Sequence, residues 1–143
     1  MIKISVDDAV SPAIAAIAKR CGDLTPAFKD FGEYYMGKID EQFQREADPY
    51  NSSWTPLSRA YADSKNRQGH IPKILQRRGH MRAKTGYAAS PGQLAIGFND
   101  NKAKWHNEGT SRMPARPLFP DKRGLPQDAK DELSASLAAF LSP

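Results

Sequence analysis

The chain has 143 residues, 39% of them hydrophobic, and its mean hydropathy is −0.66. This length suits one domain with one modest core. No apolar run approaches the roughly 20 residues that a membrane-spanning helix needs, and the first residues lack the layout of a secretory signal. The single cysteine, Cys21, excludes an internal disulfide framework. We therefore expect a protein that is made in the cytoplasm and has no contact with a membrane.

The formal net charge of +5 is spread unevenly along the chain. Residues 1–63 carry a net charge of −3 and residues 100–143 a net charge of +1, whereas residues 64–99 carry seven basic and no acidic side chains. We call residues 64–99 the basic segment. Its cations are Lys65, Arg67, Lys73, Arg77, Arg78, Arg82 and Lys84. Three interpretations stay open: a solvated face, a patch for an acidic protein, or a sequence-independent contact with nucleic-acid phosphates.

Two helices are predicted near the N-terminus, after a short strand over residues 2–6 in which apolar and polar residues alternate. Apolar positions at spacings of four, three and four predict the first helix over residues 10–21, which Gly22 would end. The second helix is expected over about residues 25–47, starting at Thr25-Pro26. Its apolar stripe is the strongest periodic signal in the chain and indicates a core or a subunit interface. The stripe consists of Leu24, Phe28, Phe31, Tyr35, Ile39 and Phe43.

Residues 48–73 form a long polar connection that is rich in turn signals. Connections of this length inside a compact domain are usually functional or disordered. We expect Trp54 and Leu57 to anchor one end, a short helix near residues 58–65 with Ser58 as its N-cap, and a partly flexible basic remainder.

The rest of the chain predicts a small sheet and a terminal helix. Residues 74–76 fit a helical turn, and residues 81–89 fit a helix or a strand, with a strand favoured for the second half because Ser90-Pro91-Gly92 is typical of a hairpin turn. Residues 94–98 alternate as a return strand, and residues 102–108 fit a third strand or a helical turn. A C-terminal helix is expected from about Pro126. The fold class is therefore α+β in a single domain over residues 1–143: two N-terminal helices, a small, mainly antiparallel sheet and a C-terminal helix.

The sequence offers no catalytic, cofactor or metal constellation. His70, His80 and His106 are too far apart for the usual pairs of zinc ligands. No signature surrounds Cys21, and the glycines do not form a phosphate-binding loop. We therefore expect neither enzyme activity nor a bound cofactor or metal.

Five short motifs of aromatic, glycine and proline residues follow one another through the middle and rear of the chain. They are Trp54-Thr55-Pro56-Leu57, Ile74-Leu75 ahead of Gly79, Ile96-Gly97-Phe98-Asn99, Trp105-His106-Asn107-Glu108-Gly109 and Pro114-Ala115-Arg116-Pro117-Leu118-Phe119. In this order they resemble the phage virion morphogenesis family, the tail-completion proteins of Mu-like and related contractile-tailed phages. The resemblance covers roughly residues 24–119. The chain departs from the family pattern at Asp48-Pro49, where a D-G pair is usual, and at Lys104-Trp105, where Tyr-Ala is frequent.

The resemblance implies an α+β structural protein that completes the tail or forms the head–tail (neck) junction as a homo-oligomeric ring, expected to have six copies. The implied partners are further copies of the chain, the tail tube or tail terminator, and neck or connector proteins; a non-specific contact with genomic DNA is also open. The implied place is the virion, in the tail or neck. The alternative is a small basic nucleic-acid-binding protein.

Subunits are expected to dock through the helix over residues 25–47, the sheet edge and the proline-rich box. Two prolines stiffen the backbone around Arg116, so its guanidinium can pair with a carboxylate of the same or a neighbouring subunit. The candidate interface residues are Trp54, Leu57, Arg116, Pro117 and Phe119.

Overall fold

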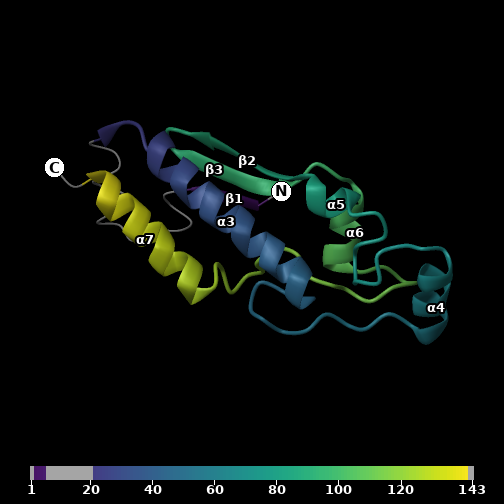
Figure 1. Cartoon of the computed structure of the whole chain (residues 1–143). Helices are drawn as coiled ribbons and strands as arrows, with labels where there is room; N and C mark the ends of the chain where they lie inside the picture. Colours follow the sequence, from purple (N-terminus) through teal and green to yellow (C-terminus); the bar gives the residue numbers. More distant parts are fainter. Residues whose placement is uncertain (1, 6–20, 142–143) are drawn as a thin grey trace. The chain divides into compact units, whose positions relative to one another are not determined.

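The computed structural model describes residues 2–5 and 21–141 (Figure 1). The predicted α+β class is confirmed, and so is the C-terminal helix. The elements in chain order are β1 (Ile2–Ser5), α3 (Thr25–Arg45), α4 (Arg59–Arg67), α5 (His80–Ala83), β2 (Thr85–Ser90), β3 (Gln93–Phe98), α6 (Lys102–Glu108) and α7 (Gln127–Leu141). The helix expected over residues 10–21 lies almost wholly outside the described residues. None of the described helices is long and apolar enough to cross a membrane.

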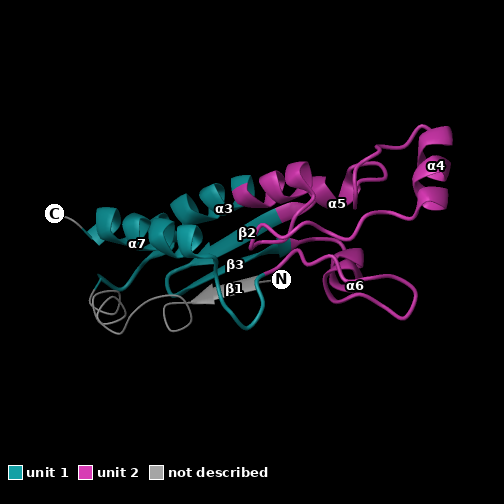
Figure 2. Cartoon of the chain, turned by 90° about the horizontal axis from the view of Figure 1, so that it is seen from below, with its two compact units in different colours: residues 1–37, 86–97, 120–143 teal, residues 38–85, 98–119 magenta. Residues whose placement is uncertain are grey.

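The chain divides into two compact units (Figure 2). Unit 1 comprises residues 1–37, 86–97 and 120–143, and unit 2 comprises residues 38–85 and 98–119. Helix α3 contributes residues to both units. A single domain over residues 1–143 stays a prediction.

Unit 1 contains most of a three-stranded sheet in the order β1-β3-β2. Strands β1 and β3 are antiparallel, with Ile2 opposite Ile96 and Ile4 opposite Leu94. Strands β2 and β3 are joined by the two residues Pro91-Gly92, as the hairpin signal predicted. The first half of α3 lies across the sheet, and α7 runs beside this half of α3 (Figures 1 and 2). The buried apolar residues of this unit are Leu24, Ala27, Phe28, Phe31, Tyr35, Leu94, Ile96, Ala129, Leu133 and Leu137.

A glycine permits the closest approach of α3 to β2. A Cβ atom at Gly32 would lie 2.7 Å from the Tyr87 ring, well inside van der Waals contact. The Tyr87 hydroxyl donates a hydrogen bond of 2.7 Å to Glu33 on the same helix. This hydrogen bond raises the pKa of Tyr87, and the burial of the side chain raises it further.

Unit 2 has an aromatic core around the second half of α3. The Phe43 ring lies edge-on to Trp54 and to Phe98, with centroid distances of 5.7 and 6.0 Å, and Phe119 lies 5.6 Å from Phe98. Such edge-to-face pairs add stability beyond the area that they bury. All six positions of the predicted stripe are buried, four of them in unit 1 and two, Ile39 and Phe43, in unit 2.

The predicted helix boundary at residue 47 was two residues too far. Helix α3 ends at Arg45 because Glu46 takes a left-handed φ of 54°. The Ala47 amide instead donates to the Gln42 carbonyl, and Ala47 then forms an isolated bridge with Ser53. The chain therefore turns sharply away from the helix toward Trp54.

Four shorter segments can be compared with the predictions. Helix α4 is capped by Ser58, whose hydroxyl accepts a hydrogen bond from the Tyr61 amide, as predicted. Residues 80–90 hold both elements, helix α5 and then strand β2. Residues 102–108 are helical and do not add a strand. Residues 74–75 form a turn in which Leu75 has a φ of 60°.

Candidate functional site

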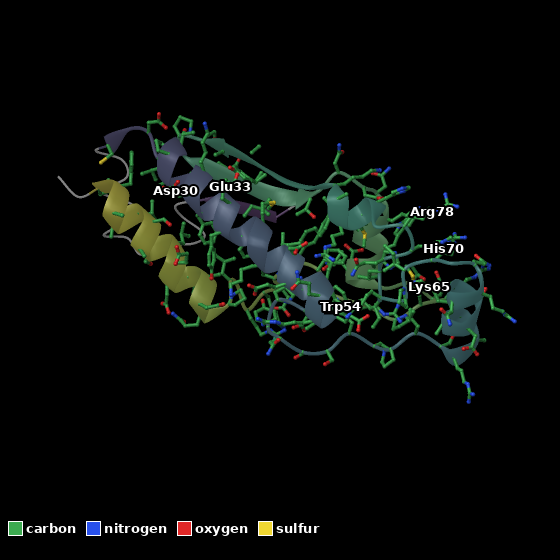
Figure 3. All side chains as sticks on the ribbon, in the orientation of Figure 1. Asp30, Glu33, Trp54, Lys65, His70 and Arg78 are labelled. Carbon is green, nitrogen blue, oxygen red and sulfur yellow. The ribbon has the colours of Figure 1, made fainter. Side chains whose placement is uncertain are left out.

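The tryptophan motif and the proline-rich box are bonded to each other within unit 2 (Figure 3 labels Trp54). The Trp54 indole Nε1 donates to the Pro117 carbonyl at 2.8 Å. The Arg116 guanidinium donates from Nε to the Thr55 carbonyl at 2.7 Å and from Nη2 to the Pro56 carbonyl at 3.1 Å. We call residues 54–56 and 116–119, joined by these bonds, the clasp.

Helix α6 is joined to the clasp by its last residues. The Asn107 side-chain oxygen accepts from the amides of Leu118 and Phe119 at 2.9 and 3.0 Å. The Arg116 amide donates to the His106 carbonyl at 2.7 Å. Three of the five sequence motifs therefore form one connected structure.

A glycine allows the chain to turn between α6 and the clasp. Gly109 has a φ of 75°, and a Cβ atom there would lie 2.7 Å from the Ala115 backbone nitrogen. Asn107 was missed as a structural residue by the sequence reasoning. Its position two residues before this glycine was the available signal, since Asn side chains commonly bond nearby backbone groups in turns.

Among the residues that the structure describes, no ion pair joins Arg116 to a carboxylate. Its side chain is 7% exposed and donates to two backbone carbonyls. Burial lowers the pKa of its guanidinium, while Tyr61 acts in the opposite direction. An arginine stays charged in proteins, so the clasp contains a buried cation that is stabilised by carbonyl dipoles.

The five candidate interface residues lie together at the clasp. Trp54 and Arg116 are buried, whereas Leu57, Pro117 and Phe119 are only partly covered. Their neighbours Pro56 and Ala115 are exposed. At the clasp, parts of Leu57, Pro117 and Phe119 are therefore exposed to solvent, whereas the Arg116 side chain is buried.

Two large aromatic side chains of unit 2 are exposed. Trp105 on α6 is 54% exposed and Tyr61 on α4 is 48% exposed. Exposed tryptophans and tyrosines on rigid elements are frequent anchors of protein interfaces. The sequence reasoning placed Trp105 in one of the five motifs and noted it as a departure from the family pattern, but did not make it a candidate interface residue.

Three cations of the basic segment are engaged within unit 2. Lys65 is buried, and its Nζ donates to the carbonyls of Lys73 at 2.7 Å and Gln76 at 3.4 Å. Burial lowers the pKa of its ammonium group. Arg82 forms an ion pair of 2.6 Å with Asp40, and Lys84 lies 3.9 Å from Asp100.

Arg67, Lys73, Arg77 and Arg78 are exposed, and one of them, Arg77, bonds to a histidine. Arg77 donates from Nε to His70 Nε2 at 3.1 Å. Burial and then the charges of Arg77, Arg78 and Lys65 lower the pKa of His70. The sequence reasoning took His70 to be solvated or hydrogen-bonded and did not connect it with these arginines. Lys73 Nζ donates to the Gln44 carbonyl at 3.3 Å.

No group of three or more His, Cys, Asp or Glu side chains that could hold a metal occurs within residues 21–141. His106 has a buried Nδ1 atom without a hydrogen-bond partner. Burial, followed by the charge of Arg116, lowers the pKa of this ring. His106 therefore acts as a neutral packing residue beside the clasp.

The sequence profile of the phage virion morphogenesis family matches residues 5–142. The chain belongs to this family. It is also 32% identical over 114 residues to the Mu-like prophage FluMu G protein 1 of Haemophilus influenzae, a match that covers 73% of this chain and 70% of that protein. No solved structure matches the chain.

Membership of the family confirms the resemblance that the five motifs indicated. It gives the protein a role in phage virion morphogenesis, associates it with the virion, and indicates a structural protein more than an enzyme.

Proposed function

We propose that this protein completes the phage tail or forms the head–tail junction as a ring of identical subunits, expected to number six. The family match over residues 5–142 carries the proposal. The proposed partners are further copies of the chain, the tail tube or tail terminator, and neck or connector proteins, and the proposed place is the tail or neck of the virion.

The clasp supports an assembly role because it fixes a surface in advance. Trp54, Arg116 and Asn107 hold the proline-rich box and α6 in one arrangement. A surface that is ordered before binding loses little conformational entropy when a partner docks. The exposed Trp105 stands on this ordered surface.

A ring requires a heterologous contact, in which two different surfaces of one subunit meet those of its neighbours. We propose that one of them consists of Trp105 and the outer edges of Leu57, Pro117 and Phe119. Arg116 then serves the interface indirectly, by holding the box, because its guanidinium is used within the subunit.

The test is native mass spectrometry and size-exclusion chromatography of the purified full chain, with and without tail-tube protein. Wild type should form a closed oligomer or bind the tube. Trp105→Ala should remove that association while circular dichroism and thermal unfolding stay unchanged. Phe140→Ala is the matched control, since Phe140 is also an exposed aromatic, 38% exposed on α7.

The alternative function, a small basic nucleic-acid-binding protein, is favoured by the exposed cations of unit 2. It predicts a monomer that binds DNA and does not bind tail or neck proteins. That result for wild type would overturn the assembly proposal.

A further inference from the structure

We propose that Arg67, His70, Arg77 and Arg78 form a binding site for the phosphate backbone of DNA. We call these four residues the basic cluster. The proposal deepens the proposed function and rests on it, because it gives the assembled protein a nucleic-acid partner.

Backbone hydrogen bonds hold the cluster together. The His70 amide donates to the Lys65 carbonyl at 3.0 Å, and the Ile71 amide donates to the Arg77 carbonyl at 3.1 Å. These bonds place the end of α4 beside residues 77–78. Figure 3 shows Lys65, His70 and Arg78 in the same region, beside α4.

Lys65 fixes this arrangement from within. Its buried ammonium group donates to the carbonyls of Lys73 and Gln76, in the loop that follows α4. Arg77 is oriented in turn by its bond to His70 Nε2. The same His70 nitrogen lies 3.1 Å from Gln68 Oε1, so the ring is held between Gln68 and Arg77. The cluster is therefore preorganised.

The arginines of the cluster have no carboxylate partner within residues 2–5 and 21–141. Arg67, Arg77 and Arg78 are exposed, and among the described residues no ion pair joins any of them to a carboxylate, in contrast to Arg82. Unit 2 as a whole carries 14 basic and 7 acidic side chains, a net charge of +7. The cluster therefore lies within a strongly positive field that attracts polyanions.

The chemistry of the surface favours phosphate over an acidic protein. Guanidinium groups bind phosphate oxygens in a bidentate manner. The cores of protein interfaces are depleted in charged residues and rich in apolar contacts, whereas the large apolar side chains that are exposed within residues 59–78 are Tyr61 and Ile71. Contacts made by such a surface would be to the backbone and independent of base sequence.

The test measures binding of the full-length protein to a labelled duplex of random sequence by fluorescence anisotropy, between about 50 and 200 mM salt. The cluster variant is Arg67→Gln/Arg77→Gln/Arg78→Gln. The control variant, Lys102→Gln/Lys104→Gln/Arg112→Gln, removes the same charge from exposed positions of the same unit. Thermal unfolding verifies that both variants are folded.

We expect the cluster variant to bind at least about tenfold more weakly than wild type. The slope of log K against log salt should become shallower by about 2 to 3, since each lost phosphate contact contributes about 0.9. The control variant should lose no more than about threefold. Equal losses in both variants would mean that net charge alone attracts DNA, and would overturn the site.

Oligomerisation and tail-tube binding are measured on the same preparations. Wild type that assembles but does not bind DNA at about 50 mM salt refutes this inference and leaves the assembly proposal standing. A cluster variant that keeps its DNA affinity but no longer binds tail or neck protein would show that the cluster contacts an acidic protein, and would likewise refute it.

Discussion

The indole nitrogen of Trp54 donates a hydrogen bond of 2.8 Å to the backbone carbonyl of Pro117, 63 positions further along the chain. The same indole packs edge-on against Phe43 of α3. Trp54 thus joins an apolar core to a polar backbone contact, a combination that tryptophan provides through its large ring and single donor. Two motifs that are far apart in the sequence are therefore parts of one tertiary contact.

Replacing Trp54 with Phe should separate the two roles of the indole. Much of the aromatic packing against Phe43 would remain, while the Pro117 carbonyl would lose its donor. We expect the free energy of unfolding to fall by about 1–3 kcal/mol, the cost of an unsatisfied buried acceptor. Urea denaturation measures this. Trp105→Phe, at an exposed position, should change stability by less than about 0.5 kcal/mol; equal losses would contradict the role of the bond.

Arg116→Ala should destabilise the protein more than Trp54→Phe. The substitution removes the donors of the Thr55 and Pro56 carbonyls and leaves a space in the clasp. We expect a loss of about 2–4 kcal/mol in urea unfolding, together with lower solubility and less oligomer. Arg112→Ala, which removes an exposed arginine nearby in the sequence, is the control. Unchanged stability and assembly in Arg116→Ala would exclude a structural role for the clasp.

Gly109→Ala tests the turn between α6 and the clasp. The new methyl group would meet the Ala115 backbone at 2.7 Å in addition to the strain of a left-handed φ. Gly69 has a similar φ of 69° but open space around it, so Gly69→Ala measures the backbone strain alone. We expect a loss of about 1 kcal/mol at Gly69 and clearly more at Gly109, measured by thermal unfolding. Equal losses would show that the close approach is relieved without cost.

Periodic features of the fold could be predicted from the sequence. The α3 stripe, the alternation of Leu94, Ile96 and Phe98, and the spacing of Ala129, Leu133 and Leu137 on α7 each repeat over several turns or residues, and all of these positions are buried. Amphipathic repetition reflects burial directly. The Ser58 cap and the Pro91-Gly92 turn could also be predicted, because the backbone conformations of helix caps and tight turns favour particular residue types.

The contacts of the clasp could not be predicted in the same way. Arg116 was expected to meet a carboxylate, but its partners are carbonyls about 60 positions earlier in the chain. No local pattern encodes a side chain that bonds a distant backbone. The basic segment illustrates the same limit, since nothing in the sequence distinguishes the buried Lys65 from the exposed Arg67.

Two glycines on α3 should respond to the same substitution in opposite directions. A methyl group at Gly32 would collide with the Tyr87 ring, which its bond to Glu33 holds in place. Gly37 has nothing within 4 Å of the corresponding position. We expect Gly32→Ala to cost about 1–3 kcal/mol by overpacking, and Gly37→Ala to stabilise the helix by about 0.5–1 kcal/mol. Thermal unfolding checks both; stabilisation by Gly32→Ala would contradict the close contact.

The pKa of His106 should make stability depend on pH near neutrality. Burial lowers the pKa of His106 in the folded state below its usual value of 6.5, and the charge of Arg116 acts in the same direction. Below pH 6.5 the unfolded chain therefore binds a proton that the folded chain does not, so stability rises with pH in this window. The contribution of His106 to the free energy of unfolding is complete above pH 6.5, and it is lost as the pH falls from 6.5 toward the lowered pKa of the folded state.

Urea unfolding between about pH 7.5 and 5.5 should show this decline in wild type. The decline should be smaller in His106→Gln, in which His70 is the histidine that still has a lowered pKa. Identical pH profiles for the two proteins would contradict a neutral, partly buried His106.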